Sequence, residues 1–110
     1  MRVRLILENN GHAMTKVAEL TQAPEAGATV EFDRPRKVNS VEEDAERGEV
    51  RVYLSEDAED FAVQMLPQAH MAYIELMKAE GWEVEGEDEL MAWLRHRVRR
   101  QRHTGPVAQN

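Results

Sequence analysis

The arginines near the end of the chain have the spacing best suited to binding chemistry. Five of the 14 Lys and Arg residues stand between residues 95 and 102, and residues 90–110 contain no Asp or Glu. If this stretch is helical, Arg95, Arg99 and Arg102 share one face, a spacing suited to contact with phosphates. Acidic residues before this stretch and arginines within it also match the two ends of a helix dipole. A structural role or a protein partner is therefore the main alternative.

Acidic residues form a second candidate surface. Residues 1–89 contain nine basic residues against all 21 acidic ones, a net charge of −12, whereas residues 90–110 carry +5. An acidic face can simply keep exposed strand edges soluble and prevent them from pairing with other chains. Alternatively, it can occupy the basic groove of a partner that handles nucleic acid. The residues predicted to bind a partner are Glu42, Glu43, Asp44, Glu46 and Trp93.

Patterns typical of catalysis or metal binding are not found in the sequence. The four histidines are scattered, cysteine is absent, and the two serines, Ser40 and Ser55, have structural interpretations as a bulge and a helix cap. Asp57 and Asp60 are one helical turn apart and could act as an acid and a base, but at a helix start they serve the exposed N–H groups equally well. We therefore expect a protein that is not an enzyme, with no metal and no cofactor.

The first half of the chain shows the alternation typical of β-strands. Val3, Leu5 and Leu7 alternate with polar residues over 2–8, and a turn signal follows. Residues 14–20 are either a second strand, antiparallel to the first, or a short helix. Good helix formers and a single β-branched apolar residue are the argument for the helix, and the choice stays open at this point.

Three later segments are predicted as strands: residues 29–33, 36–43 and 49–54. In the middle segment Val38 and Val41 are three residues apart, and a bulge at Asn39–Ser40 would bring both to the same face. Short strands joined by tight turns in this way suggest a small curled sheet or a partly open barrel.

The second half has helical periodicity. Ser55 is the expected N-cap, Pro67 either kinks the helix or begins a second one, and Gly81 ends it. Residues 82–85 are expected as a connector or short edge strand, before a last helix over about 87–101. One apolar stripe is predicted as the buried face of the first helical region: Phe61, Met65, Ala69, Ala72 and Leu76, with the offset pair Tyr73 and Met77. The last helix is predicted to bury Leu90, Met91, Leu94 and Val98.

These elements predict an α+β fold, with an N-terminal antiparallel sheet or small partly open barrel of four to five strands followed by two to three C-terminal helices. A single domain is expected over 1–103, with the sheet in 1–54 and the helices in 55–103, and a flexible tail over 104–110. No segment approaches the roughly 20 apolar residues of a membrane span, and no signal peptide is apparent. We expect a cytoplasmic protein.

The pattern over residues 28–54 (ATVEFDRPRKVNSVEEDAERGEVRVYL) resembles small curled-sheet modules of phage and mobile-element accessory proteins. The shared features are an alternating strand, a basic-apolar strand, an acidic turn and a strand that ends in an aliphatic residue. The resemblance implies an accessory or inhibitory protein, and it brings no catalytic residues.

The favoured function is that of a non-enzymatic interaction protein that binds a macromolecular partner through charged surfaces, for example a phage-type inhibitor of host nucleic-acid machinery. One alternative is a nucleic-acid-associated protein that contacts phosphates through Arg95, Arg99 and Arg102. Another is a homo-oligomer in which the basic end docks on the acidic face of a neighbouring copy.

Overall fold

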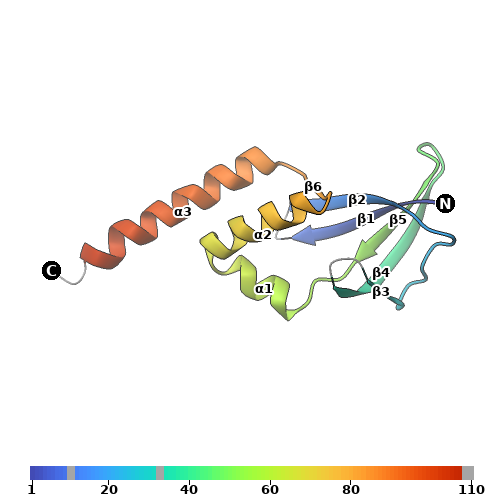
Figure 1. Cartoon of the computed structure of the whole chain (residues 1–110), viewed down its shortest axis with the longest axis horizontal. Helices are drawn as coiled ribbons and strands as arrows, with labels where there is room; N and C mark the ends of the chain where they lie inside the picture. The colour runs from blue at the N-terminus through green and yellow to red at the C-terminus, as the bar shows by residue number, and fades with distance from the viewer. Residues whose placement is uncertain (10–11, 32–33, 108–110) are drawn as a thin grey trace.

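The computed structural model describes residues 1–9, 12–31 and 34–107, without the side chains of Asn9 and of residues 101–107. The described ranges contain six strands and three helices (Figure 1). In chain order they are β1 (Arg2–Asn9), β2 (His12–Glu19), β3 (Thr29–Glu31), β4 (Pro35–Asp44), β5 (Glu49–Leu54), α1 (Ala58–Gln64), α2 (Pro67–Ala79), β6 (Glu83–Val84) and α3 (Glu87–Val107).

The strands form one sheet with the order β3-β4-β5-β1-β2-β6. All neighbours pair antiparallel except β1 and β5, which are parallel, with Val3 opposite Val50 and Leu7 opposite Leu54. The predicted α+β class is confirmed, but the sheet is mixed and open, not purely antiparallel or closed into a barrel. Its sixth strand, β6, comes from the helical half of the chain, so the sheet is not confined to residues 1–54.

The predicted strands are confirmed with small changes of boundary. β5 covers the predicted residues 49–54, and the ambiguous segment 14–20 lies in strand β2 except for Leu20. The register between β4 and β5 shifts between Val38 and Ser40, which confirms the bulge. The strand expected over 29–33 is described up to Glu31, and residues 32 and 33 lie outside the described ranges.

The main core lies between one face of the sheet and α2. Val3, Leu5 and Leu7 of β1 are fully buried, and they belong to one cluster with Tyr73 and Met77 of α2. β1 is a central strand with neighbours on both sides, so its inward residues are covered completely. Removing this apolar surface from water is the main source of stability.

Helix α1 begins at a reciprocal capping box, and Ser55 is not the N-cap as predicted. Asp57 is the cap: its carboxylate accepts from the backbone N–H of Asp60, and the Asp60 carboxylate accepts from the N–H of Asp57. The backbone N–H of Ser55 instead donates to the carbonyl of Lys37, which extends the β4–β5 pairing. The cap therefore lies two residues later than predicted.

Pro67 starts a second helix, which confirms one of the two predicted alternatives. It lies in the first turn of α2, where a missing N–H costs nothing. The break changes the phase of the helical pattern, so most of the predicted buried stripe is wrong, although its offset pair, Tyr73 and Met77, is buried. Met65 is 75% exposed, Phe61 58% and Leu76 57%. The buried face of α2 consists of Pro67, His70, Tyr73, Ile74 and Met77.

Helix α3 packs beside α2 through a second, smaller cluster. Ile74 of α2 contacts Leu90, Met91 and Leu94 of α3, three of the four residues predicted to be buried. Val98, the fourth, is half-buried. The helix backbone continues to Val107, so it extends through part of the predicted tail; residues 108–110 lie outside the described ranges.

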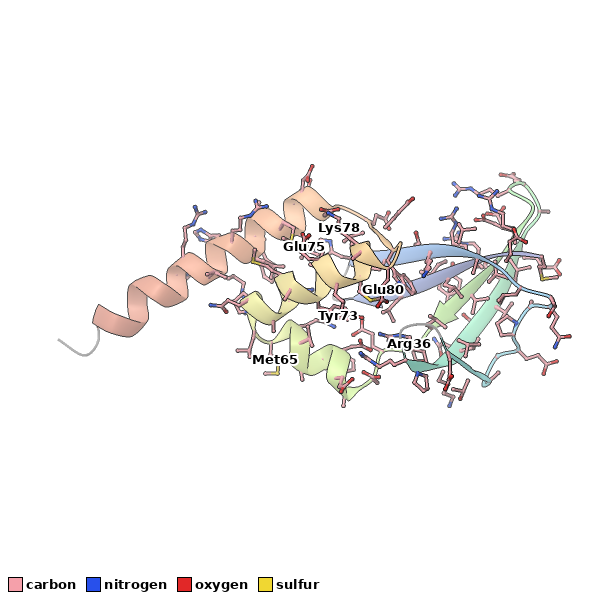
Figure 2. All side chains as sticks on the ribbon, in the orientation of Figure 1. Arg36, Met65, Tyr73, Glu75, Lys78 and Glu80 are labelled. Carbon is pink, nitrogen blue, oxygen red and sulfur yellow. The ribbon has the colours of Figure 1, made fainter. Side chains whose placement is uncertain are left out.

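A buried ionic cluster joins the sheet to both α1 and α2 (Figure 2). The Arg36 guanidinium from β4 makes two hydrogen bonds to the Asp60 carboxylate, at 2.9 and 3.1 Å, and one to the Tyr73 hydroxyl at 3.0 Å. The side chains of Arg36 and Asp60 are both fully buried. Arg34 also binds Asp60, and it forms a two-pronged pair with Asp57 that holds the pKa of Asp57 well below its usual range. One carboxylate, that of Asp60, therefore ties three elements together.

His70 is a second buried polar residue on α2, only 2% exposed. No described group makes a hydrogen bond to its Nδ1. Burial lowers the pKa of His70 below its ordinary value of 6.5, and the positive charges of His12 and Arg97 lower it further. The His70 side chain is therefore neutral in the folded protein at pH 7.

We expect the free energy of unfolding to fall as the pH falls below about 6.5, because the unfolded chain then binds a proton that buried His70 does not. One such group contributes at most about 1.4 kcal/mol per pH unit. Urea unfolding between about pH 5 and 7.5 measures the slope. The slope should flatten in His70→Gln and persist in His96→Gln, where the exposed His96 is replaced. An equal slope in all three proteins would contradict the assignment.

Candidate functional site

Helix α3 is longer than the helix that supports it. Lys78 near the end of α2 pairs with Glu87 at the start of α3, at 2.6 Å, so the two helices run in opposite directions. α2 has 13 residues and α3 has 21, so at 1.5 Å per residue α3 extends about 12 Å beyond its neighbour. Figure 1 shows the C-terminal part of α3 projecting from the rest of the molecule. The predicted arginine surface lies where this projection begins.

Arg95 and Arg99 carry unneutralised charge on that part of α3. Both side chains are exposed, and neither makes an ion pair or hydrogen bond with any described residue. They lie one turn apart on the same face. Arg102 follows on the same helix, but its side chain lies outside the described part of the chain.

A small apolar groove lies between these two arginines. It has a volume of about 240 Å³ and is lined by Met71 of α2 and by Arg95, Val98 and Arg99 of α3. Met71 and Val98 are half-buried, so an apolar floor lies between two positive charges. We call these four residues the α2–α3 groove.

Trp93 lies on a different face of α3 from the α2–α3 groove, because positions 93 and 95 are about 200° apart around a helix. Its ring is 46% exposed, and the Arg97 guanidinium stacks over it at 4.9 Å from the ring centre. This contact fixes one more arginine on the surface of α3. Trp93 therefore lies on the surface and is not part of the core, and its role at an interface stays a prediction.

The predicted acidic residues lie on the β4–β5 hairpin, at the other end of the molecule. Glu42 accepts a hydrogen bond from the Tyr53 hydroxyl at 3.2 Å, and Asp44 pairs with Arg47 at 3.9 Å. Glu43 and Glu46 are exposed and have no partner among the described residues. We call Glu42, Glu43, Asp44 and Glu46 the acidic hairpin.

The two predicted sets of residues form separate surfaces. The molecule measures 60 Å along its longest axis, with the acidic hairpin near one end and α3 at the other (Figure 1). The predicted partner-binding set is therefore split, because Trp93 is on α3 and the other four residues are on the hairpin. The hairpin and the α3 arginines lie toward opposite ends of this axis, so salt, with a Debye length of about 8 Å at physiological ionic strength, weakens the attraction between the hairpin carboxylates and the arginines.

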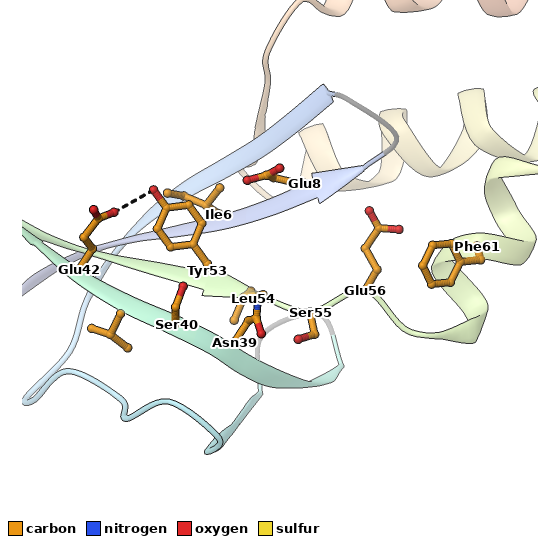
Figure 3. Close-up of a pocket in the computed structure, with 11 residues that line it drawn as sticks. Ile6, Glu8, Asn39, Ser40, Glu42, Tyr53, Leu54, Ser55, Glu56 and Phe61 are labelled. Atoms are coloured by element: carbon orange, nitrogen blue, oxygen red, sulfur yellow. Dashed lines mark hydrogen bonds between the residues drawn. The ribbon is translucent and has the colours of Figure 1, made fainter.

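A shallow groove of about 850 Å³ was not anticipated from the sequence (Figure 3). It lies largely over the face of the sheet opposite the core and reaches the start of α1. Ile6 and Tyr53 contribute apolar surface, and Glu8, Glu42 and Glu56 contribute carboxylates. Burial raises the pKa of Tyr53, and its hydrogen bond to Glu42 adds to this effect. The phenol is therefore neutral at neutral pH and donates its hydrogen to Glu42.

Two arginines farther along that sheet face are paired with an acid of the same chain. The buried Glu49 carboxylate accepts a hydrogen bond from Arg4 at 2.7 Å and lies 3.5 Å from Arg2. The hydrogen bond from Arg4 lowers the pKa of Glu49. Arg2 and Arg4 of β1 therefore form ion pairs within the fold, whereas Arg95 and Arg99 form none with the described residues.

Known proteins give no guide to these surfaces. No family model, curated protein or solved structure matches the chain. The described ranges contain no cluster of three or more His, Asp or Glu side chains arranged to hold a metal ion. Nor does any helix in them combine the length and apolar character needed to span a bilayer.

Sequence reasoning did not place Met71 in a groove because a methionine at helical spacing is usually core. A signal was present for Arg36, which lies two residues before Val38 and therefore on the core face of β4. A charged residue on the core face of a strand requires a buried partner of opposite charge, and Asp60 is a partner of this kind.

Proposed function

We propose that this chain is a non-enzymatic interaction protein that binds a macromolecular partner through the arginine surface of α3. The observation that carries the proposal is that Arg95 and Arg99 are exposed without a carboxylate partner in the described structure. Elsewhere the arginines Arg2, Arg4, Arg34 and Arg36 are paired with acids of the same chain. Lys37 and Arg51 also form no ion pair with a described residue, but they stand singly on the sheet and not together on a projecting helix. Unpaired charge on a projecting helix is suited to steering and holding a negatively charged partner.

A protein partner is favoured over nucleic acid. Phosphate contacts need charge alone, whereas the α2–α3 groove adds apolar surface between the arginines, and Trp93 adds an exposed aromatic ring. The net charge of −7 also opposes broad contact with a nucleic acid. Phosphate binding remains the alternative function, and self-association through α3 and the acidic hairpin is the third.

The acidic hairpin supports a second candidate function. Glu43 and Glu46 are exposed and unpaired among the described residues, so they could enter the basic groove of a nucleic-acid-handling protein. A phage-type inhibitor would act in this way. Both proposals describe docking and require no reaction centre.

Affinity capture with three forms of the full chain tests the proposal. We expect the partner retained by the unmodified protein to be lost by Arg95→Gln/Arg99→Gln and retained by Glu43→Gln/Glu46→Gln, a matched loss of two charges at the opposite end. Loss by the hairpin variant alone would favour the second candidate. Loss of the signal after nuclease treatment would favour phosphate binding, and identical capture by all three forms would refute a charge-based mode. Sedimentation of each form separates self-association from the other outcomes.

A further inference from the structure

We infer that the α2–α3 groove binds an acidic amphipathic helix of a partner protein, with one apolar side chain on Met71 and Val98 and flanking carboxylates on Arg95 and Arg99. This inference rests on the proposed function and names the chemistry of the partner. The inferred site includes the arginine surface and adds a specific binding site for an apolar side chain.

The size and lining of the groove fit one large apolar side chain. An apolar cavity of roughly 150 Å³ is enough to hold a benzene ring, and the α2–α3 groove has about 240 Å³. Met71 and Val98 form its floor and come from two different helices. A methionine at such a site adapts its shape to different apolar partners.

Charge around the groove selects an acidic partner. Arg95 and Arg99 stand on the rim one turn apart, so they match carboxylates spaced one turn apart on a facing helix. The N-terminal end of α2 adds to the positive potential, because its cap residue Leu66 provides no side-chain hydrogen bond to the exposed N–H groups. A basic helix would be repelled from this surface.

The ends of the helices also leave room for a third helix. Met71 lies about one turn into α2, close to where α2 begins and α3 continues unsupported. Met65 and Leu66, which directly precede α2, are 75% and 58% exposed. Apolar surface of this kind at the start of α2 extends the area that a partner helix could bury.

The test uses the full chain and a synthetic helical peptide with one Phe between Glu residues one turn to either side. We expect the methyl resonances of Met71 and Val98 to shift during titration to about 1 mM peptide, and the peptide with Phe→Ser to bind about tenfold more weakly. Absence of any methyl shift at that concentration would overturn the inference.

Variants separate the groove from the arginines. Met71→Gln/Val98→Gln should weaken binding of the Phe peptide about tenfold and leave binding of the Phe→Ser peptide within twofold, whereas Arg95→Gln/Arg99→Gln should weaken binding of both peptides. Far-UV circular dichroism confirms that each variant is folded, and Leu76→Gln, on an exposed site of α2, is the matched control. Unchanged peptide affinity in the folded groove variant would refute the inference that the groove binds the apolar side chain. Unchanged peptide affinity in the arginine variant would refute the proposed function itself.

Discussion

Replacing Asp60 by alanine is expected to lower the free energy of unfolding by about 3–5 kcal/mol. The Asp60 carboxylate is fully buried and is bonded to the equally buried Arg36 guanidinium. Its removal takes a carboxylate away from the buried Arg36 charge, deprives Tyr73 of a neighbour at 3.4 Å and removes half of the α1 capping box. Equilibrium urea unfolding followed by circular dichroism gives the value.

A double variant tests whether the buried charge of Arg36 causes the loss of stability. Arg36→Met/Asp60→Leu removes both charges, so it should recover most of the loss seen in Asp60→Ala, except for about 1 kcal/mol from the missing cap. If the double variant is less stable than Asp60→Ala, the penalty comes from lost hydrogen bonding and not from a buried charge. A cost below about 1 kcal/mol for Asp60→Ala would mean that water reaches Arg36.

Leu94→Ala is expected to cost about 2–5 kcal/mol and to release α3 before the rest of the fold. Leu94 is fully buried in the small cluster formed with Ile74, Leu90 and Met91. Among the described residues, the half-buried Met71 and Val84 and the ion pair between Lys78 and Glu87 add to this cluster in holding α3. Hydrogen exchange should therefore accelerate in α3 and remain slow in β1 and β5.

Leu76→Ala is the matched control for this prediction. It makes the same chemical change on α2 at a side chain that is 57% exposed, so it should alter stability by no more than about 0.5 kcal/mol. Uniformly faster exchange throughout Leu94→Ala would show that α3 and the sheet unfold as one unit. In the expected case, peptide binding at the α2–α3 groove weakens along with the docking of α3.

The strands were predictable because their signal is local. Alternation located β5 at its observed ends, and the unequal spacing of Val38 and Val41 was enough to locate the bulge. The parallel pairing of β1 with β5 was not predictable, because alternation gives the face of a residue and not the direction of the neighbouring strand.

The helices were predictable in position but not in phase. Pro67 indicated a break, yet the predicted stripe assumed one continuous helix through it, and Met65 and Leu76 proved to be exposed as a result. Asp57 and Ser55 were both good N-caps, and only the pairing of Ser55 with Lys37 decides between them. Short-range rules cannot weigh such a tertiary contact.

The candidate site was predictable only in its charged part. The clustering of arginines in the last helix is visible in the sequence, so Arg95 and Arg99 could be named. The floor of the groove could not, because Met71 and Val98 are 27 positions apart and meet only through the packing of α2 on α3.

The pairing of β1 with β5 has a consequence for how the chain is made. β1 meets β2 within a few residues, but its other neighbour follows Val3 by 47 positions. During translation one edge of β1 therefore stays without a partner until β5 leaves the ribosome. Closing that long loop costs entropy before the pairing compensates for it, so this step is a natural bottleneck in folding. Pauses in synthesis before residue 49 would prolong the interval in which nascent chains can aggregate through β1.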